Sequence, residues 1–546
     1  MTLNKLQIRA KILPILAELK AEPRLSYDVF IMKAKELHEI EDFDTFFEIL
    51  CKELSKVNED KYIDILRAML LEFIPREMFE TKAEEILKMP DKPDMLKYQL
   101  IQTLKTIGKE IDYEELFEYL EDAQSIINYD TEKLLEHAVV NPETQIDFLD
   151  FLSSLQNEDK TLLIDSLAAD YTGNNLANIL APVLYSDFPE DVHLKAISIL
   201  GETKSPLAIK SLEYLHEITD NDIIRTNCKK SLNMLKLAGA TKEAGEKFYK
   251  TIMAESTPYK CYTGIPDGHY NQGFLFSRKR NDGTLMMFSV VISKIYGIVD
   301  SFGFFNTTEE EYARIALRFG QNEIRFEISP EYFKKVLDEA FELTRKRKES
   351  IRYEAVCWSM LTCDITPEKE SEKEWVEENI NEIPINQKIV NLLYQTNYLD
   401  KWFFAPKDHN AFNKLIDDFT TNKNLDFNYV EEKTNEIFDE IWNEETEKLF
   451  LKNIYTTCYL FGYTGFTDYA KILYSVLFHQ DLKRKMQEDI IKKSVYEYFF
   501  NLKESHKEFK FPANIFRRKK QEEETTDIKT VEAIIAGIEA KWVEQQ

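Results

Sequence analysis

The sequence has few residues that interrupt regular secondary structure. Its 546 residues include 15 glycines and 16 prolines, which is little for a chain of this length. Glycine loosens a helix and proline removes a hydrogen-bond donor from it, so their scarcity favours helices joined by short loops. The chain is also too long for a single core, and we expect about three or four domains or one elongated array.

Cysteine is scarce and widely spaced, which excludes the common zinc motifs. The six cysteines include no C-x-x-C pair. The two nearest, Cys357 and Cys363, are not followed by histidines at zinc-finger spacing. We therefore expect no metal site and no cofactor.

Long apolar runs are absent as well. No charge-free apolar stretch of about 18 residues occurs, so we expect no membrane insertion. Near the N-terminus, Lys5, Arg9 and Lys11 interrupt the apolar residues, and the segment lacks the apolar core of a signal peptide. Together with the six widely spaced cysteines, these absences predict a protein of the reducing cytoplasm.

Positive charge is in deficit. Lysine and arginine number 70 against 97 aspartates and glutamates, and the formal net charge is −27. A polyanion repels DNA and RNA, so nucleic-acid binding is not expected, and the short basic runs at residues 345–348 and 517–520 do not change this. The acidic residues are typical of solvated helix faces, and a protein partner with a basic surface would complement them. The sequence leaves the oligomeric state open.

Helical periodicity fills the first 240 residues. Apolar residues recur three and four positions apart, and Pro75, Pro90 and Pro93 mark the ends of such runs. Helices are predicted for residues 27–37, 43–54, 62–73, 114–127, 130–139 and 142–155.

A repeat is visible within this region. Residues 192–201 align with residues 224–233, and Ser205-Pro206 opens a second helix between them. The two aligned segments share a small residue followed by a leucine, which are Ala196 and Leu200 in the first and Cys228 and Leu232 in the second.

This helix–turn–helix unit resembles a HEAT repeat, particularly the short bacterial HEAT-like variety. The resemblance covers residues 160–239 well and residues 1–160 weakly. Arg225 matches the arginine usual at its position, whereas His193 does not. The resemblance implies an α-solenoid, a fold that serves many roles and carries no particular activity with it.

The stretch at residues 257–328 is different, because it is rich in strands and glycines. Strands are predicted at residues 259–265, 271–279, 284–292, 295–305 and 324–328, and Asn281-Asp-Gly283 signals a tight hairpin. Helices are predicted from about residue 307 to residue 319 and from Pro330 to about Arg347. Together with the strands, they predict an α+β module. We expect a mostly antiparallel sheet with helices packed on one side.

The fold class is therefore mainly α, with four parts. They are a HEAT-like array at residues 1–240, the α+β module at 241–349, a second helical region at 350–511, and a charged linker with a terminal amphipathic helix at 512–546. The C-terminal helical region is rich in aromatic residues, which at helical spacing are usually core.

The best polar cluster of the module comprises Asp267, His269 and Asp300. A histidine beside carboxylates can act as a general base or a metal ligand. The alternative is turn chemistry, because Asp267 and Gly268 are both favoured in turns. Cys261 is a further candidate nucleophile, and its alternative is a buried structural thiol.

The segment from Gly297 to Gly303 contains two glycines but lacks the spacing of a phosphate-binding loop. Its alternative is a strand with a bulge or a close backbone approach. No catalytic signature remains, so the leading hypothesis is a non-catalytic scaffold or adaptor that binds protein partners. The alternative is that the α+β module is an enzyme or a small-ligand domain, and a nucleic-acid-associated factor is a weaker third.

Overall fold

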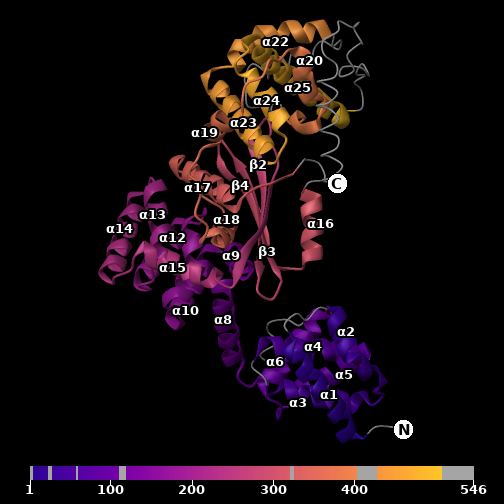
Figure 1. Cartoon of the computed structure of the whole chain (residues 1–546). Coiled ribbons are helices and arrows are strands. Elements are labelled where there is room, and N and C mark those ends of the chain that lie inside the picture. The colour runs from indigo at the N-terminus through magenta and orange to yellow at the C-terminus, as the bar shows by residue number, and fades with distance from the viewer. Residues whose placement is uncertain are drawn as a thin grey trace. The chain divides into compact units, whose positions relative to one another are not determined.

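The computed structural model describes residues 4–22, 27–56, 59–109, 118–319, 325–402 and 427–506. The chain divides into two compact units, Met1–His137 and Ala138–Gln546. The described residues are mainly helical, with one small antiparallel sheet in the second unit, as the sequence predicted (Figure 1). The four-part division at residues 240, 349 and 511 stays a prediction.

The first unit consists of short amphipathic helices around their own core. Asp42 caps one of them by accepting a hydrogen bond from the Thr45 amide at 3.0 Å, and Phe46 and Leu50 of the same helix are buried. The elements are α1 Lys5–Ala21, α2 Tyr27–Ala34, η1 Lys35–Glu39, α3 Phe43–Leu54, α4 Asp60–Phe73, α5 Arg76–Leu87 and α6 Asp94–Thr106.

One helix differs from the prediction. Two helices were expected at residues 114–127 and 130–139, but a single helix, α8, spans Ala123–Val140. Asp130 suggested a helix start, yet no glycine or proline stands between the two expected segments, and an aspartate without such a break is tolerated inside a helix. Residues 110–117 lie outside the described residues.

The second unit begins with a succession of helices. Where α12 and α14 pack together, a Cβ added at Gly201 would lie 2.6 Å from Ser231 Oγ, and this hydroxyl donates to the Ile197 carbonyl at 2.8 Å. Gly201 and Ser231 therefore let the two helices approach closely. The elements are α9 Pro142–Ser154, α10 Asn157–Asp170, α11 Gly173–Leu180, η2 Ala181–Leu184, α12 Glu190–Glu202, α13 Ala208–Ile218, α14 Asp222–Leu237 and α15 Lys242–Met253.

The sheet has five antiparallel strands in the order β4-β3-β2-β1-β5. The predicted Asn281-Asp-Gly283 hairpin is present, with Gly283 at φ +86° and the Arg280 amide donating to the Thr284 carbonyl at 2.9 Å. The strands are β1 Ser256–Thr263, β2 Asn271–Arg280, β3 Leu285–Ser293, β4 Gly297–Thr307 and β5 Phe326–Glu327.

Residues 297–303 belong to β4, which Gly297 begins at φ +83°, a conformation that favours glycine. The register of β4 against β3 shifts between Ile298 and Asp300, which marks a bulge. At Gly303 an added Cβ would lie 2.4 Å from Trp358 Cε2, so the glycine permits a close approach. This confirms the strand-and-bulge interpretation of the segment.

Helices cover both faces of the sheet, so the prediction of helices on one side was wrong (Figure 1). On one face, Phe276 stacks on Phe333 of α17, Pro330–Lys346, with ring centroids 5.3 Å apart. On the other face, Met287 packs against α16, Glu309–Phe319. The reason lies in β2 and β3, whose apolar residues are consecutive and do not alternate with polar ones, so both faces require burial.

The remaining helices complete the core of the second unit. Trp358, Trp402 and Tyr459 join the sheet core, as predicted for aromatic residues at helical spacing, whereas Tyr463 is 45% exposed. The charged linker and terminal amphipathic helix predicted at residues 512–546 lie outside the described residues, as do residues 403–426 of the predicted helical region. The elements are α18 Tyr353–Ser359, η3 Met360–Thr362, α19 Glu372–Asn379, α20 Gln387–Gln395, η4 Asn397–Leu399, α22 Phe427–Ile441, α23 Glu444–Tyr463, α24 Thr467–Val476 and α25 Gln480–His506.

Candidate functional site

Asp267 and His269 lie together in the turn between β1 and β2. The Asp267 carboxylate accepts the Asn271 amide at 2.8 Å. Burial raises the pKa of this carboxyl, and the hydrogen bond from Asn271 and the nearby His269 partly offset that effect. A raised carboxyl pKa is compatible with acid–base chemistry, but the hydrogen bond to the turn backbone is ordinary turn chemistry.

The same turn is anchored to the C-terminal helical region. The Gly268 amide donates to the Lys401 carbonyl at 2.7 Å, and Asn453 Nδ2 donates to the Asp267 carbonyl at 3.0 Å. Trp402 Nε1 donates to the Pro266 carbonyl at 2.9 Å. These bonds give the turn a structural function, which is to fasten the sheet to the helices that follow it.

Asp300 does not join this pair. It lies on β4 and is separated from the turn by β3, because the strand order places β3 between β4 and β2. Its carboxylate is 61% exposed and pairs with Arg352 Nη1 at 3.1 Å. The structure thus brings together Asp267 and His269 but not Asp300, and the catalytic role of the three residues stays a prediction.

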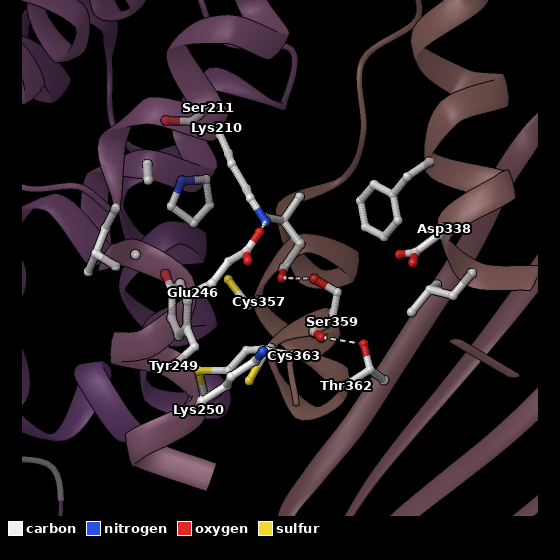
Figure 2. Close-up of a pocket in the computed structure, with 18 of the residues that line it drawn as sticks. Lys210, Ser211, Glu246, Tyr249, Lys250, Asp338, Cys357, Ser359, Thr362 and Cys363 are labelled. Atoms are coloured by element: carbon white, nitrogen blue, oxygen red, sulfur yellow. Dashed lines mark hydrogen bonds and ion pairs between the residues drawn. The ribbon is translucent and has the colours of Figure 1, made fainter. Parts of the chain in front are cut away.

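Another described cavity lies between α13 and α15 on one side and α17 and α18 on the other. We call it the lysine pocket (Figure 2). It has a volume of about 540 Å³, which falls in the range of small-molecule sites. Lysines on three helices line it, namely Lys210 on α13, Lys242 and Lys250 on α15, and Lys334 on α17.

Two carboxylates face these lysines. Lys210 Nζ lies 3.0 Å from Glu246, and the two side chains point toward each other in Figure 2. The hydrogen bond from Lys210 lowers the pKa of Glu246, and the charges of Lys250 and Lys334 lower it further. Lys334 itself pairs with Asp338 one turn along α17. Ammonium groups from three helices are therefore close enough to act on the same carboxylate.

A buried hydrogen-bond network holds one wall of the lysine pocket in place. Tyr249 donates to Asn178 Oδ1 at 2.8 Å, and Asn178 Nδ2 donates to the Ala138 carbonyl at 2.9 Å. Gln145 donates to the Asn178 carbonyl. Asn178 is 1% exposed, so its bonds are shielded from water and fix the orientation of Tyr249.

The cysteines of the pocket are inert thiols. Cys357 is buried and Cys363 is half-buried, and burial raises the pKa of Cys363 to about 11 and that of Cys357 well above its usual value. Cys261 on β1 is also buried with a raised pKa. Reactive cysteines need a lowered pKa, so these are structural residues. Within the described ranges no group of three or more residues is arranged to hold a metal ion.

A compact ionic cluster joins the end of β3 to α17, α19 and α23. Lys294 Nζ donates to Thr456 Oγ1 at 2.6 Å, and Lys335 Nζ lies 3.4 Å from Glu372. Lys294, Glu372 and Thr456 line a cavity of about 40 Å³, which is too small for a substrate. Removal from water lowers the pKa of Lys294 to about 7. This cluster was not predicted from the sequence, because a lysine that ends an apolar strand is usually solvated.

Part of one face of the sheet, on β4, is exposed to solvent. On β4, Val299, Phe302 and Phe304 are 44%, 51% and 43% exposed, and the two phenylalanine rings contact each other edge to face at 6.2 Å. Met287, the β3 partner of Phe304, is buried under α16, so the covered part of this face ends beside the phenylalanines. We call Phe302 and Phe304 the open sheet face. Its signal in the sequence is Phe302 and Phe304 at strand spacing, the period that places side chains on one face.

No protein-family model matches the chain, and no curated protein and no solved structure matches it either. Among the helices of the described segments, none combines the length and the apolar composition that a bilayer crossing requires.

Proposed function

We propose that this protein is a non-catalytic adaptor that binds a partner protein on the open sheet face. The observation that carries the proposal is the exposure of Phe302 and Phe304 side by side on one strand. Exposed neighbouring aromatic rings are unfavourable in water, and aromatic residues are enriched at the centres of protein interfaces. A partner that covers them would bury both rings.

The charge around the open sheet face favours one kind of partner. Asp300 lies on the same strand, and α16 begins with Glu309, Glu310 and Glu311, which are exposed. With a net charge of −27 on the chain, the matching surface is an apolar anchor surrounded by lysines and arginines. We therefore expect a protein segment of that composition and not an acidic peptide.

We also propose that residues 160–239 form a HEAT-like array that extends the binding surface. The close packing of α12 on α14 at Gly201 and Ser231 supports it, as does the recurrence of helix pairs in this region. A helical array buries its own core and presents a long face to partners, which suits an adaptor.

The test compares capture of partners by the wild-type chain and by two variants. Phe302→Ser with Phe304→Ser removes the anchors, while Phe478→Ser removes an aromatic side chain that is 52% exposed in another part of the chain. A partner that is retained by wild type and by Phe478→Ser, lost with the double variant, and bound more weakly at high salt supports the proposal. Equal retention by all three proteins, or a robust turnover by the purified chain, would refute it.

The alternative, an enzyme or a small-ligand domain, is favoured by a separate observation, the lysine pocket. It is a formed cavity with convergent charged groups, and it does not include Asp267, His269 or Asp300.

A further inference from the structure

The lysine pocket contrasts in charge with the rest of the chain. Four lysines and two carboxylates line it, whereas the whole chain has a net charge of −27. The side chains of Lys210 and Lys242 are 59% and 50% exposed, so they lie at the rim of the cavity, whereas Lys334 is 18% exposed. A locally positive rim on an acidic protein attracts anions to the cavity mouth.

The pairing of these lysines leaves one of them available. Lys210 pairs with Glu246, Lys242 pairs with Glu213 outside the cavity at 2.6 Å, and Lys334 pairs with Asp338. Lys250 forms no ion pair with any residue that the structure describes, yet its charge acts on Glu246. A ligand carboxylate or phosphate near Lys250 would form an ion pair with it. The same group would also interact with Lys210 and Lys334, which keep their ion pairs with Glu246 and Asp338.

The walls away from the lysines are apolar. Tyr185, Leu337, Phe341 and Val356 contribute to them from η2's C-terminal end, α17 and α18. An inorganic ion fills a small part of about 540 Å³ and leaves these side chains uncovered. A ligand that fills the cavity therefore has an apolar body in addition to its charged group.

We propose that the lysine pocket binds a small organic anion, with an aromatic or other apolar body and one carboxylate or phosphate group. The charged group lies among Lys210, Lys250 and Lys334, and the body lies against Leu337, Phe341 and Val356. Inorganic phosphate shares the charge of this ligand but not its body, so the two are distinguishable by affinity. The proposal does not depend on the adaptor function.

The test uses 8-anilinonaphthalene-1-sulfonate, an aromatic anion whose fluorescence rises on binding, and its uncharged analogue N-phenyl-1-naphthylamine. We expect the anion to bind at least about tenfold more tightly than the analogue. Each of Lys210→Gln, Lys250→Gln and Lys334→Gln weakens anion binding about fivefold, the effect of losing one partly exposed ion pair. These changes leave the affinity for the analogue unaltered. Lys229→Gln, an exposed lysine on α14 outside the pocket, serves as the matched control and changes neither affinity.

Two further variants separate the lysine pocket from other sites. Thr366→Trp places a large ring at an exposed edge of the cavity and abolishes binding without touching any lysine. Phe302→Ser with Phe304→Ser leaves binding intact, which shows that the probe does not lie on the open sheet face. The thermal midpoint of every variant verifies folding. Binding that survives the lysine variants and Thr366→Trp, or that disappears with the phenylalanine variant, overturns the proposal. If millimolar inorganic phosphate alone displaces the probe, a simple oxyanion is sufficient for binding, and the proposed requirement for an apolar body is overturned.

Discussion

Replacing Arg278 by methionine is expected to destabilise the second unit strongly. Arg278 lies on β2 and its side chain is fully buried. It forms a two-pronged ion pair with Asp364, in which Nη1–Oδ1 is 2.6 Å and Nη2–Oδ2 is 2.9 Å. Asp364 follows η3, so the pair joins the sheet to the segment after α18.

The magnitude follows from the bonds that the substitution removes. Nε donates to Ser256 Oγ at 2.9 Å, Nη1 donates to the Leu361 carbonyl at 3.0 Å and Nη2 donates to the Ser256 carbonyl at 2.9 Å. Every N–H of the guanidinium therefore has an acceptor. Arg278 is buried, but the Asp364 side chain is 30% exposed, so water can reach the carboxylate that the substitution leaves behind. The carbonyls at Leu361 and Ser256 still lose their donors, and we expect a cost of about 3 kcal/mol, the lower end of the range for a buried ion pair. Arg278→Lys keeps the positive charge but cannot donate two parallel hydrogen bonds to Asp364. We therefore expect an intermediate loss in the free energy of unfolding.

Urea unfolding followed by tryptophan fluorescence is the suitable assay. All five tryptophans lie in the unit Ala138–Gln546, so the signal reports on the part of the chain that contains Arg278. The midpoint shift multiplied by the slope of the transition gives the change in the free energy of unfolding. Arg314→Met, at an exposed position of α16, is the matched control and is expected to stay within about 0.5 kcal/mol of wild type.

The result that would refute this reasoning is a loss below about 1 kcal/mol in Arg278→Met, because that is the range of an exposed pair. A second refutation comes from the combined variant with Asp364→Asn. If the ion pair holds the two elements together, the double substitution costs less than the sum of the single ones, and strict additivity contradicts the coupling.

Three further predictions concern a titrating lysine, a glycine and a surface pair. Because the folded-state pKa of Lys294 is lowered to about 7, the unfolded state binds more protons above pH 7, and this residue adds stability as pH rises toward about 10. The advantage of Lys294→Met over wild type should therefore shrink between pH 7 and pH 10 in urea unfolding, and a constant difference would contradict the lowered pKa. Gly303→Ala forces a Cβ within 2.5 Å of the Met287 carbonyl and should lower the thermal midpoint by the equivalent of about 1–3 kcal/mol, whereas Ser301→Ala, two residues away, should not lower it. Asp300→Ala removes an exposed ion pair, so a loss above about 1 kcal/mol in the same assay would show that the pair is more than a surface contact.

Local signals in the sequence predicted the elements well. The Asn281-Asp-Gly283 turn and the apolar periodicity each act over a few residues, and the corresponding hairpin and helices are present. The error at α8 has the same origin, because Asp130 is locally compatible with both a helix start and a helix interior.

The sites were harder to predict because they join distant segments. Lys210, Glu246 and Lys334 are far apart in the sequence and meet only when α13, α15 and α17 pack. A lysine on a helix is ordinarily a solvated residue, so none of the three stands out alone. Asp267, His269 and Asp300 were predicted as a cluster from their residue types, without information on their positions in the fold. The strand order separates Asp300 from the other two.

The strand order also has a consequence for synthesis of the chain. Strands β1 to β4 form a meander in which each strand pairs with the next one, so pairing can begin as soon as β2 emerges from the ribosome. The face that carries Phe274, Phe276 and Phe288 must wait for Phe333 of α17 and for the C-terminal helices that share its core. A nascent chain that is released before residue 330 therefore presents three aromatic rings on a preformed sheet, a surface that promotes aggregation and recruits chaperones.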